Sequence, residues 1–248
     1  MAFYERYLSG ETKAVHDELL QLGAESFSAA SYPDVEKVFA ETFSRVAHNL
    51  KIIYAELRRT NYLFLSETQY QERPLLPPFR NTDKLLTKLD QATQPFGYVP
   101  LSLRYFYKFV GGVDFTWDYE TQEEFRWNMA DPVVICSLKS LVEEVAEEYW
   151  CEDIQQYVDD ENFGFAFFEL APDDLHKDNT SGGPPYSLRI TRDPSLDAPF
   201  LNEPHNTTFI NYLRLCFEHC GFPGITRTDH NNDYRDFFAK VKPLLKPI

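Results

Sequence analysis

Long apolar runs and cysteines are both scarce in this 248-residue sequence. No segment approaches the roughly 20 apolar residues that a membrane-spanning helix requires, so we expect no membrane partner. The first ten residues mix acid, base and tyrosine without an apolar run, which argues against a secretory signal. The four cysteines form no CxxC pair, and we expect free thiols in a reducing compartment. These features predict a cytoplasmic protein.

Basic residues are also few, because 24 lysines and arginines stand against 39 acids and leave a net charge of −15. A surface that binds nucleic acid needs basic groups to neutralise phosphates, so we expect no nucleic-acid partner. A solvated surface that keeps the protein soluble is the simpler explanation of the excess acid. A surface that attracts a basic partner is the other explanation, and charge alone decides little between them.

The motifs of the commonest enzyme classes are absent. There is no Walker loop, no GxGxxG after a strand, no HExxH and no GxSxG. His205, Cys216, His219 and Cys220 could suggest a zinc site, but His219 and the cysteine pair fall on different faces of a predicted helix. Cys216 and Cys220 are therefore expected in the core. We expect no metal and no cofactor.

Aromatic residues, by contrast, make up 16% of the chain, and apolar periodicity predicts both helices and strands. The predicted helices cover residues 12–22, 33–59, 82–89, 100–110, 138–149, 207–220 and 233–245. The predicted strands cover residues 62–65, 113–117, 133–136, 163–170 and 186–190.

This order of elements predicts an α+β fold, with a mixed or antiparallel sheet flanked by helices. Residues 1–65 are expected to form an N-terminal helical extension packed on the core. The strand at 163–170 carries aromatic residues on both faces, so we expect it to be central and covered on two sides. The proline-rich run at 73–79 is expected to be an extended connector without regular structure.

One candidate binding segment lies between two predicted strands. Trp117 and Asp118, with Trp127 nearby, combine rigid aromatic rings with charge, which is typical of interface hot spots. Such residues are equally common at the rim of a core, and both interpretations stay open. A third possibility is a small-ligand site in an aromatic cleft near Trp117.

A second candidate segment follows the strand predicted at 163–170. Asp173, Asp174 and His176 are residue types that a metal site or an acid–base site would use. The simpler interpretation is a capped turn, in which Asp173 accepts backbone N–H groups of a single helical turn after Pro172. We favour the turn because no second ligand cluster can be placed from the sequence.

The stretch Phe96–Phe115 resembles the signature region of the SUKH superfamily, which includes the yeast cell-wall glucan-synthesis regulator and many bacterial immunity proteins. The shared pattern is a helix that starts at Pro100, carries an aromatic face, ends at Gly111-Gly112 and leads into a strand. The resemblance implies a SUKH-like α+β domain over residues 66–248, or one continuous domain over residues 1–248.

The resemblance also implies a non-enzymatic domain that binds a protein partner, such as a toxin that it neutralises, often a nuclease, or that acts as a regulatory scaffold. An acidic surface would suit a nuclease with a basic active site. The alternative hypothesis is a metal-dependent or hydrolytic enzyme that uses Asp173, Asp174 and His176. The expected binding residues are those of the two candidate segments.

Overall fold

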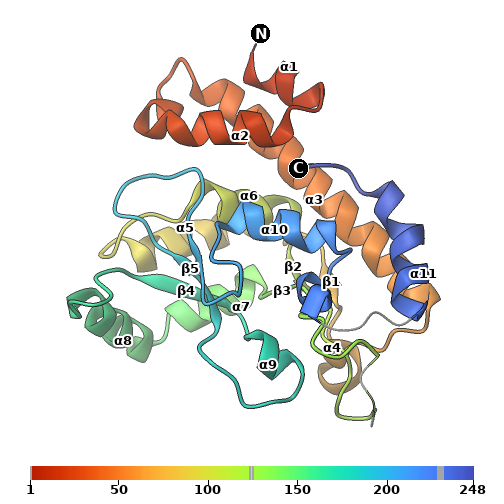
Figure 1. The fold of residues 1–248 in the computed structure, drawn as a ribbon. Coiled ribbons are helices and arrows are strands. Elements are labelled where there is room, and N and C mark those ends of the chain that lie inside the picture. Colours follow the sequence, from red (N-terminus) through yellow and green to blue (C-terminus); the bar gives the residue numbers. More distant parts are fainter. Residues whose placement is uncertain (1, 123, 125, 228–231) are drawn as a thin grey trace.

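The computed structural model describes residues 2–122, 124, 126–227 and 232–248 and shows an α+β fold (Figure 1). The α-helices are α1 (Phe3–Leu8), α2 (Thr12–Gln21), α3 (Tyr32–Arg59), α4 (Leu65–Tyr70), α5 (Thr82–Thr93), α6 (Leu101–Phe109), α7 (Leu138–Val145), α8 (Glu148–Asp159), α9 (Asp174–Lys177), α10 (Phe209–Glu218) and α11 (Asn232–Val241). Short 3₁₀ helices are η1 (Gly23–Phe27), η2 (Pro223–Arg227) and η3 (Lys242–Leu244). The strands are β1 (Leu75–Leu76), β2 (Gly112–Asp114), β3 (Val134–Ile135), β4 (Phe167–Ala171), β5 (Tyr186–Arg189) and β6 (Phe200–Leu201).

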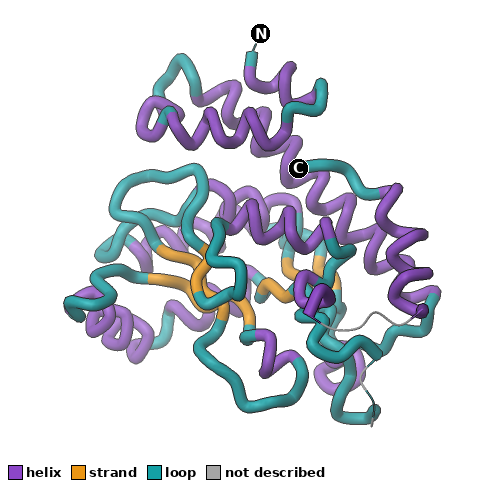
Figure 2. The backbone as a smooth tube through the Cα atoms, in the orientation of Figure 1, coloured by secondary structure: helices purple, strands orange, loops and turns teal. Residues whose placement is uncertain are grey.

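The strands form two small antiparallel sheets, in the orders β1-β2-β3 and β4-β5-β6. A hydrogen bond from Cys136 N to Leu170 O (2.8 Å) joins the two sheets in the middle of the molecule. Figure 2 shows the strands at the centre with helices around them. The fold class predicted from the sequence is therefore confirmed, including the antiparallel pairing.

Helix α3 runs along one side of the molecule and confirms the strongest helix prediction. Its apolar positions recur every three or four residues, so one stripe from Val35 to Leu57 is buried. Helices α1 and α2 pack at its first half, and α11 lies beside its second half (Figure 1). The N-terminal helices thus continue directly into the core.

Buried polar contacts fix the N-terminal helices on α3. His16 Nε2 lies 3.0 Å from Thr42 Oγ1, which donates to Tyr7 Oη at 2.9 Å. Burial lowers the pKa of His16 to about 3, so this imidazole is neutral and joins a polar contact that needs no counter-charge.

Helix α6 ends where the sequence predicted, but for a different physical reason. Glycine at a helix end commonly adopts the left-handed conformation, but neither Gly111 nor Gly112 has a positive φ. Instead, Gly111 lies against β1: a Cβ there would lie 2.0 Å from Pro77 O. Gly111 N donates to Leu76 O at 2.8 Å, so the glycine allows β1 to pair with the chain that follows α6.

That pairing corrects the prediction for residues 73–79, which contain the two-residue strand β1. The predicted strand at 62–65 is also wrong, because Phe64 makes only an isolated bridge to Trp117 and α4 begins at Leu65. The helix predicted at 138–149 is two helices, α7 and α8, which separate at residues 146–147. Within the described residues, no helix combines the length and the apolar character needed to cross a bilayer.

Candidate functional site

The turn that holds Asp173 and His176 uses its polar side chains on its own backbone. Asp173 Oδ1 accepts from Leu175 N (2.8 Å) and His176 N (3.1 Å), which caps α9, and its Oδ2 lies 2.5 Å from His176 Nδ1. Gly182 leaves room for this carboxylate, because a Cβ there would lie 2.1 Å from Asp173 Oδ1 and would displace it from the cap. Burial opposes ionisation of Asp173, but the hydrogen bonds from His176 and Leu175 outweigh it and lower the pKa.

A buried ion pair anchors the same turn at the last residue of α9. Lys177 Nζ donates to Asp131 Oδ1 at 2.6 Å, and the two side chains are 0% and 1% exposed. Tyr186 Oη donates to the other carboxylate oxygen at 3.2 Å, and the Lys177 ammonium lies 4.4 Å from the Tyr186 ring centre. The last residue of α9 is thus tied to the loop before β3 and to β5, and the turn is held rigidly.

The aromatic and acidic residues of the first candidate segment belong to the core and its rim. Trp127 is buried among Tyr62, Phe222, Tyr234 and Phe237. Trp117 is half-buried, stacks edge-on against Tyr62 at 5.0 Å and donates its indole N–H to Glu124 O at 3.2 Å.

Asp118, in the same segment, is fully buried and accepts the backbone N–H groups of Glu120 and Thr121, each at 3.2 Å. Burial opposes its ionisation, but the hydrogen bonds from Thr121 outweigh this and lower its pKa. Two contacts bring the two predicted segments together: the Lys177–Asp131 pair, and a hydrogen bond from Met129 N to Asp178. Neither segment presents Asp118 or Asp173 to a ligand, because both carboxylates are enclosed.

A groove elsewhere on the molecule exposes aromatic rings and carboxylates, the kinds of side chain that the two candidate segments enclose. It consists of two adjoining hollows, of about 810 and 470 Å³, that share Tyr157, Phe167 and Glu169. Helix α8 forms one wall, the outward face of β4 forms the floor, and residues before β5 and around β6 extend it. We call this feature the α8–β4 groove.

Aromatic rings line the α8–β4 groove in a connected row. Tyr157 packs edge-on against both Phe163 (5.2 Å) and Phe167 (5.0 Å), and Phe163 continues to Phe165 at 6.0 Å. Tyr149, Tyr157 and Phe163 are 57%, 39% and 49% exposed, which is unusual for such large rings. Rigid aromatic side chains that remain exposed in a hollow are typical of the centre of a binding interface.

The charged residues that line the α8–β4 groove are all acidic, and the nearby Arg189 packs on the Phe165 ring without lining either hollow. Its lining contains Glu144, Asp153, Asp160 and Glu169, and no lysine or arginine lines either hollow in the described part of the chain. The sequence contains no lysine or arginine between Lys139 and Lys177, so this region carries much of the excess negative charge. The groove is therefore both aromatic and acidic.

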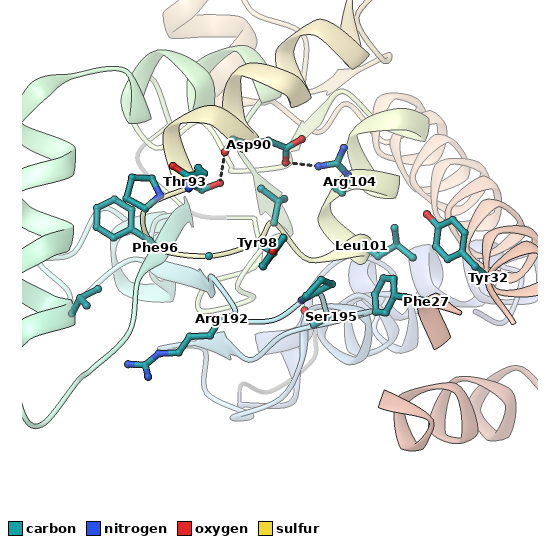
Figure 3. A pocket seen from close by; sticks show the side chains of 16 residues that line it. Phe27, Tyr32, Asp90, Thr93, Phe96, Tyr98, Leu101, Arg104, Arg192 and Ser195 are labelled. Carbon is teal, nitrogen blue, oxygen red and sulfur yellow. Dashed lines mark hydrogen bonds and ion pairs between the residues drawn. The ribbon is translucent and has the colours of Figure 1, made fainter. Parts of the chain in front are cut away.

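A further hollow of about 760 Å³ lies between the N-terminal helices and the core (Figure 3). Its walls include Phe27, Tyr32 and Tyr98. Its arginine on α6 is already paired, because Arg104 Nη1 donates to Asp90 Oδ1 at 2.5 Å, as Figure 3 shows. Arg192 also lines this hollow, so it carries both charge signs, whereas the lining of the α8–β4 groove is acidic.

Against this geometry, comparison with known proteins gives no further guidance. No family model, no curated protein and no solved structure matches the chain.

Sequence reasoning missed the α8–β4 groove, although two signals were present. The strand predicted at 163–170 has aromatic residues on both faces, and we expected both faces to be covered. The actual strand β4 is shorter, with Phe168 and Leu170 buried, Phe167 half-buried and Glu169 exposed, so that prediction is wrong for the outward face. The second signal was the four glutamates within the helix predicted at 138–149.

Proposed function

We propose that this chain is a non-enzymatic protein-binding domain and that its α8–β4 groove binds a basic segment of the partner. The observation that carries the proposal is the row of exposed rings beside carboxylates of one charge sign. Rings supply desolvated contact area at low entropic cost, and complementary charge steers the encounter and fixes the register.

The finer identity of the partner rests on the resemblance of Phe96–Phe115 to the SUKH superfamily. A toxin with a basic active site, such as a nuclease, would match the acidic groove, and a regulatory scaffold would use the same surface for a basic client. The described cysteines are all free thiols, which supports a role in the reducing cytoplasm.

The alternative, a hydrolytic or metal-dependent enzyme, would have to use Asp173, Asp174 and His176. The Asp173–His176 contact resembles a base with its orienting carboxylate. Neither of these two residues lines the α8–β4 groove or the hollow of Figure 3, so these hollows would not place a substrate beside the imidazole. We therefore propose binding rather than catalysis.

The test is partner capture from the native host with matched variants, followed by binding measurements on the purified partner. Tyr157→Ala/Phe163→Ser removes two rings of the groove, and we expect its affinity to fall by about 10- to 100-fold. Tyr70→Ala is the control, because Tyr70 is 67% exposed on α4, away from the groove. A partner that binds the groove variant as tightly as the wild type would show that the proposed surface is wrong.

A further inference from the structure

Two carboxylates face the same hollow from different elements of the fold. Glu144 comes from α7 and Glu169 from β4, and both line the larger hollow of the α8–β4 groove. Among the described residues, neither carboxylate has a hydrogen-bond or ion-pair partner. Lysine and glutamate do pair elsewhere on α7, where Lys139 Nζ lies 3.5 Å from Glu143 Oε1. The hollow thus holds two acids without a counter-charge.

Bringing these acids together carries an electrostatic cost. Burial raises the pKa of Glu144 to about 7, and the negative charge of Glu169 adds to the rise. Burial also raises the pKa of Glu169. A cation placed between the two carboxylates would offset both the desolvation and the mutual repulsion, so the hollow favours a positively charged occupant.

The rings around the pair indicate which kind of cation fits. Tyr149 and Tyr157 line the same hollow, and aromatic faces attract cations. The molecule shows this arrangement internally: Arg189 lies with its guanidinium 4.5 Å from the centre of the Phe165 ring, at the far end of the groove. A guanidinium is planar, stacks on rings and donates to two carboxylates at once, which an ammonium does less well.

We propose that Glu144 and Glu169 together bind one arginine side chain of the partner, with the tyrosine rings of the α8–β4 groove against its guanidinium plane. This inference rests on the proposed function and specifies the anchor of the basic segment. The arginine would enter the larger hollow, while neighbouring residues of the segment contact the rings of the smaller one.

The experiment uses the terminally blocked peptide acetyl-Gly-Arg-Gly-Arg-Gly-amide and its analogue with citrulline in place of arginine, titrated into the full chain and followed by NMR at constant ionic strength. Citrulline keeps the shape and removes the charge. We expect the arginine peptide to shift the amide signals of the groove at pH 8, and the citrulline peptide to bind at least 10-fold more weakly. Equal binding of the two peptides would overturn the inference.

Matched variants distinguish a specific arginine-binding site from general electrostatic attraction between the acidic surface and the peptide. Glu144→Gln/Glu169→Gln should weaken the arginine peptide at least 10-fold. Glu143→Gln/Glu152→Gln removes the same charge from nearby exposed positions outside the hollow and should change the affinity less than 2-fold. If both double variants weaken binding equally, only the net charge matters and Glu144 and Glu169 do not form a specific arginine-binding site.

A pH series adds a readout that follows the carboxylate pair. The titratable groups that face it are Tyr149, Asp153, Tyr157 and Asp160 on α8, Cys136 after β3, and Tyr107 on α6. Burial raises the pKa of the Cys136 thiol to about 12, so it stays neutral in this series. Affinity for the arginine peptide should fall several-fold from pH 8 to pH 6 as Glu144 is protonated, and this fall should vanish in the Glu144→Gln/Glu169→Gln variant.

Binding measurements with the purified partner show which of the two proposals fails. If Tyr157→Ala/Phe163→Ser abolishes partner binding and Glu144→Gln/Glu169→Gln does not, the proposed function stands and the proposed arginine-binding site is wrong. If neither variant weakens the partner, both proposals fail.

Discussion

The α9 turn and the α8–β4 groove contain the same kinds of residue and use them in opposite ways. At the turn, Asp173 caps the backbone and Lys177 is sealed against Asp131, so the polar groups serve the fold. In the groove, Glu144 and Glu169 have no ion-pair partner among the described residues, and the rings remain exposed. Charged groups that stabilise the fold are enclosed and paired, whereas those available to a partner cost the fold some stability.

This contrast also shows why residue type alone is a weak guide to a site. The sequence presents Asp173, Asp174 and His176 as a dense polar cluster, which attracts attention as a candidate catalytic set. Glu144 and Glu169 lie 25 positions apart and look ordinary in the sequence. Only the packing of α7 against β4 brings them to one hollow.

The largest effect is expected from breaking the buried pair. Lys177→Met leaves the Asp131 carboxylate buried without its counter-charge, and we expect a loss of about 3–5 kcal/mol in the free energy of unfolding. Urea denaturation measures it, with Lys139→Met as the control, because that exposed lysine should contribute no more than about 1 kcal/mol.

A double variant sharpens the same test. Lys177→Met/Asp131→Asn removes both charges, and asparagine tolerates the positive φ of 51° at position 131. It should recover much of the loss. If Lys177→Met alone costs less than about 1 kcal/mol, the pair does not hold the turn as described.

A smaller loss is expected at the cap of the turn. Asp173→Ala removes the acceptor for two backbone N–H groups and should cost about 1–2 kcal/mol at pH 7, with Asp173→Asn costing less. Because the pKa of Asp173 lies below its usual 3.8, its stabilisation is present above that pH and is lost as the pH falls further. Urea titrations at pH 7 and pH 3 should therefore show a shrinking difference; the exposed Asp193→Ala provides the baseline, and an equal cost for both would contradict the capping role.

The smallest effect, and one of opposite sign, is expected in the groove. Glu144→Gln removes a carboxylate whose pKa is raised from 4.5 to about 7, so the folded state of the wild type loses stability as the pH rises through that interval. The variant should lack this fall and, at pH 8, should equal or exceed the wild type by no more than about 1 kcal/mol. Denaturation at pH 5 and pH 8 checks it against Glu143→Gln, and a destabilised Glu144→Gln at pH 8 would remove the contrast between the two regions.

The parts of the fold with strong periodicity could be predicted from the sequence. Helix α3 has a buried stripe over 28 residues, and α6 has a proline start and a glycine stop. Helix α8 was missed because only Trp150 and Ile154 are buried in it, which gives too narrow an apolar stripe to detect.

The cap of the turn by Asp173 is local and was predicted correctly. The long-range polar contacts could not be predicted, because they join distant positions. Lys177 stands among acids and amides in the sequence and would be taken for a surface residue, yet Asp131, 46 positions earlier, makes its burial possible. The α8–β4 groove could not be predicted for the same reason. Its acidic character depends on which carboxylates face the hollow without an ion-pair partner, and the sequence does not show this.

Helix α3 has one more consequence, for the cooperativity of unfolding. Its stripe packs against the N-terminal helices, α6 and α11, and Asn49 also binds Lys246 near the other end of the chain through two hydrogen bonds. The N-terminal helices therefore cannot melt away without exposing a helix that the rest of the core shares. Heat should unfold the whole chain in one all-or-none transition, with the first sixty residues and the sheets losing their structure together.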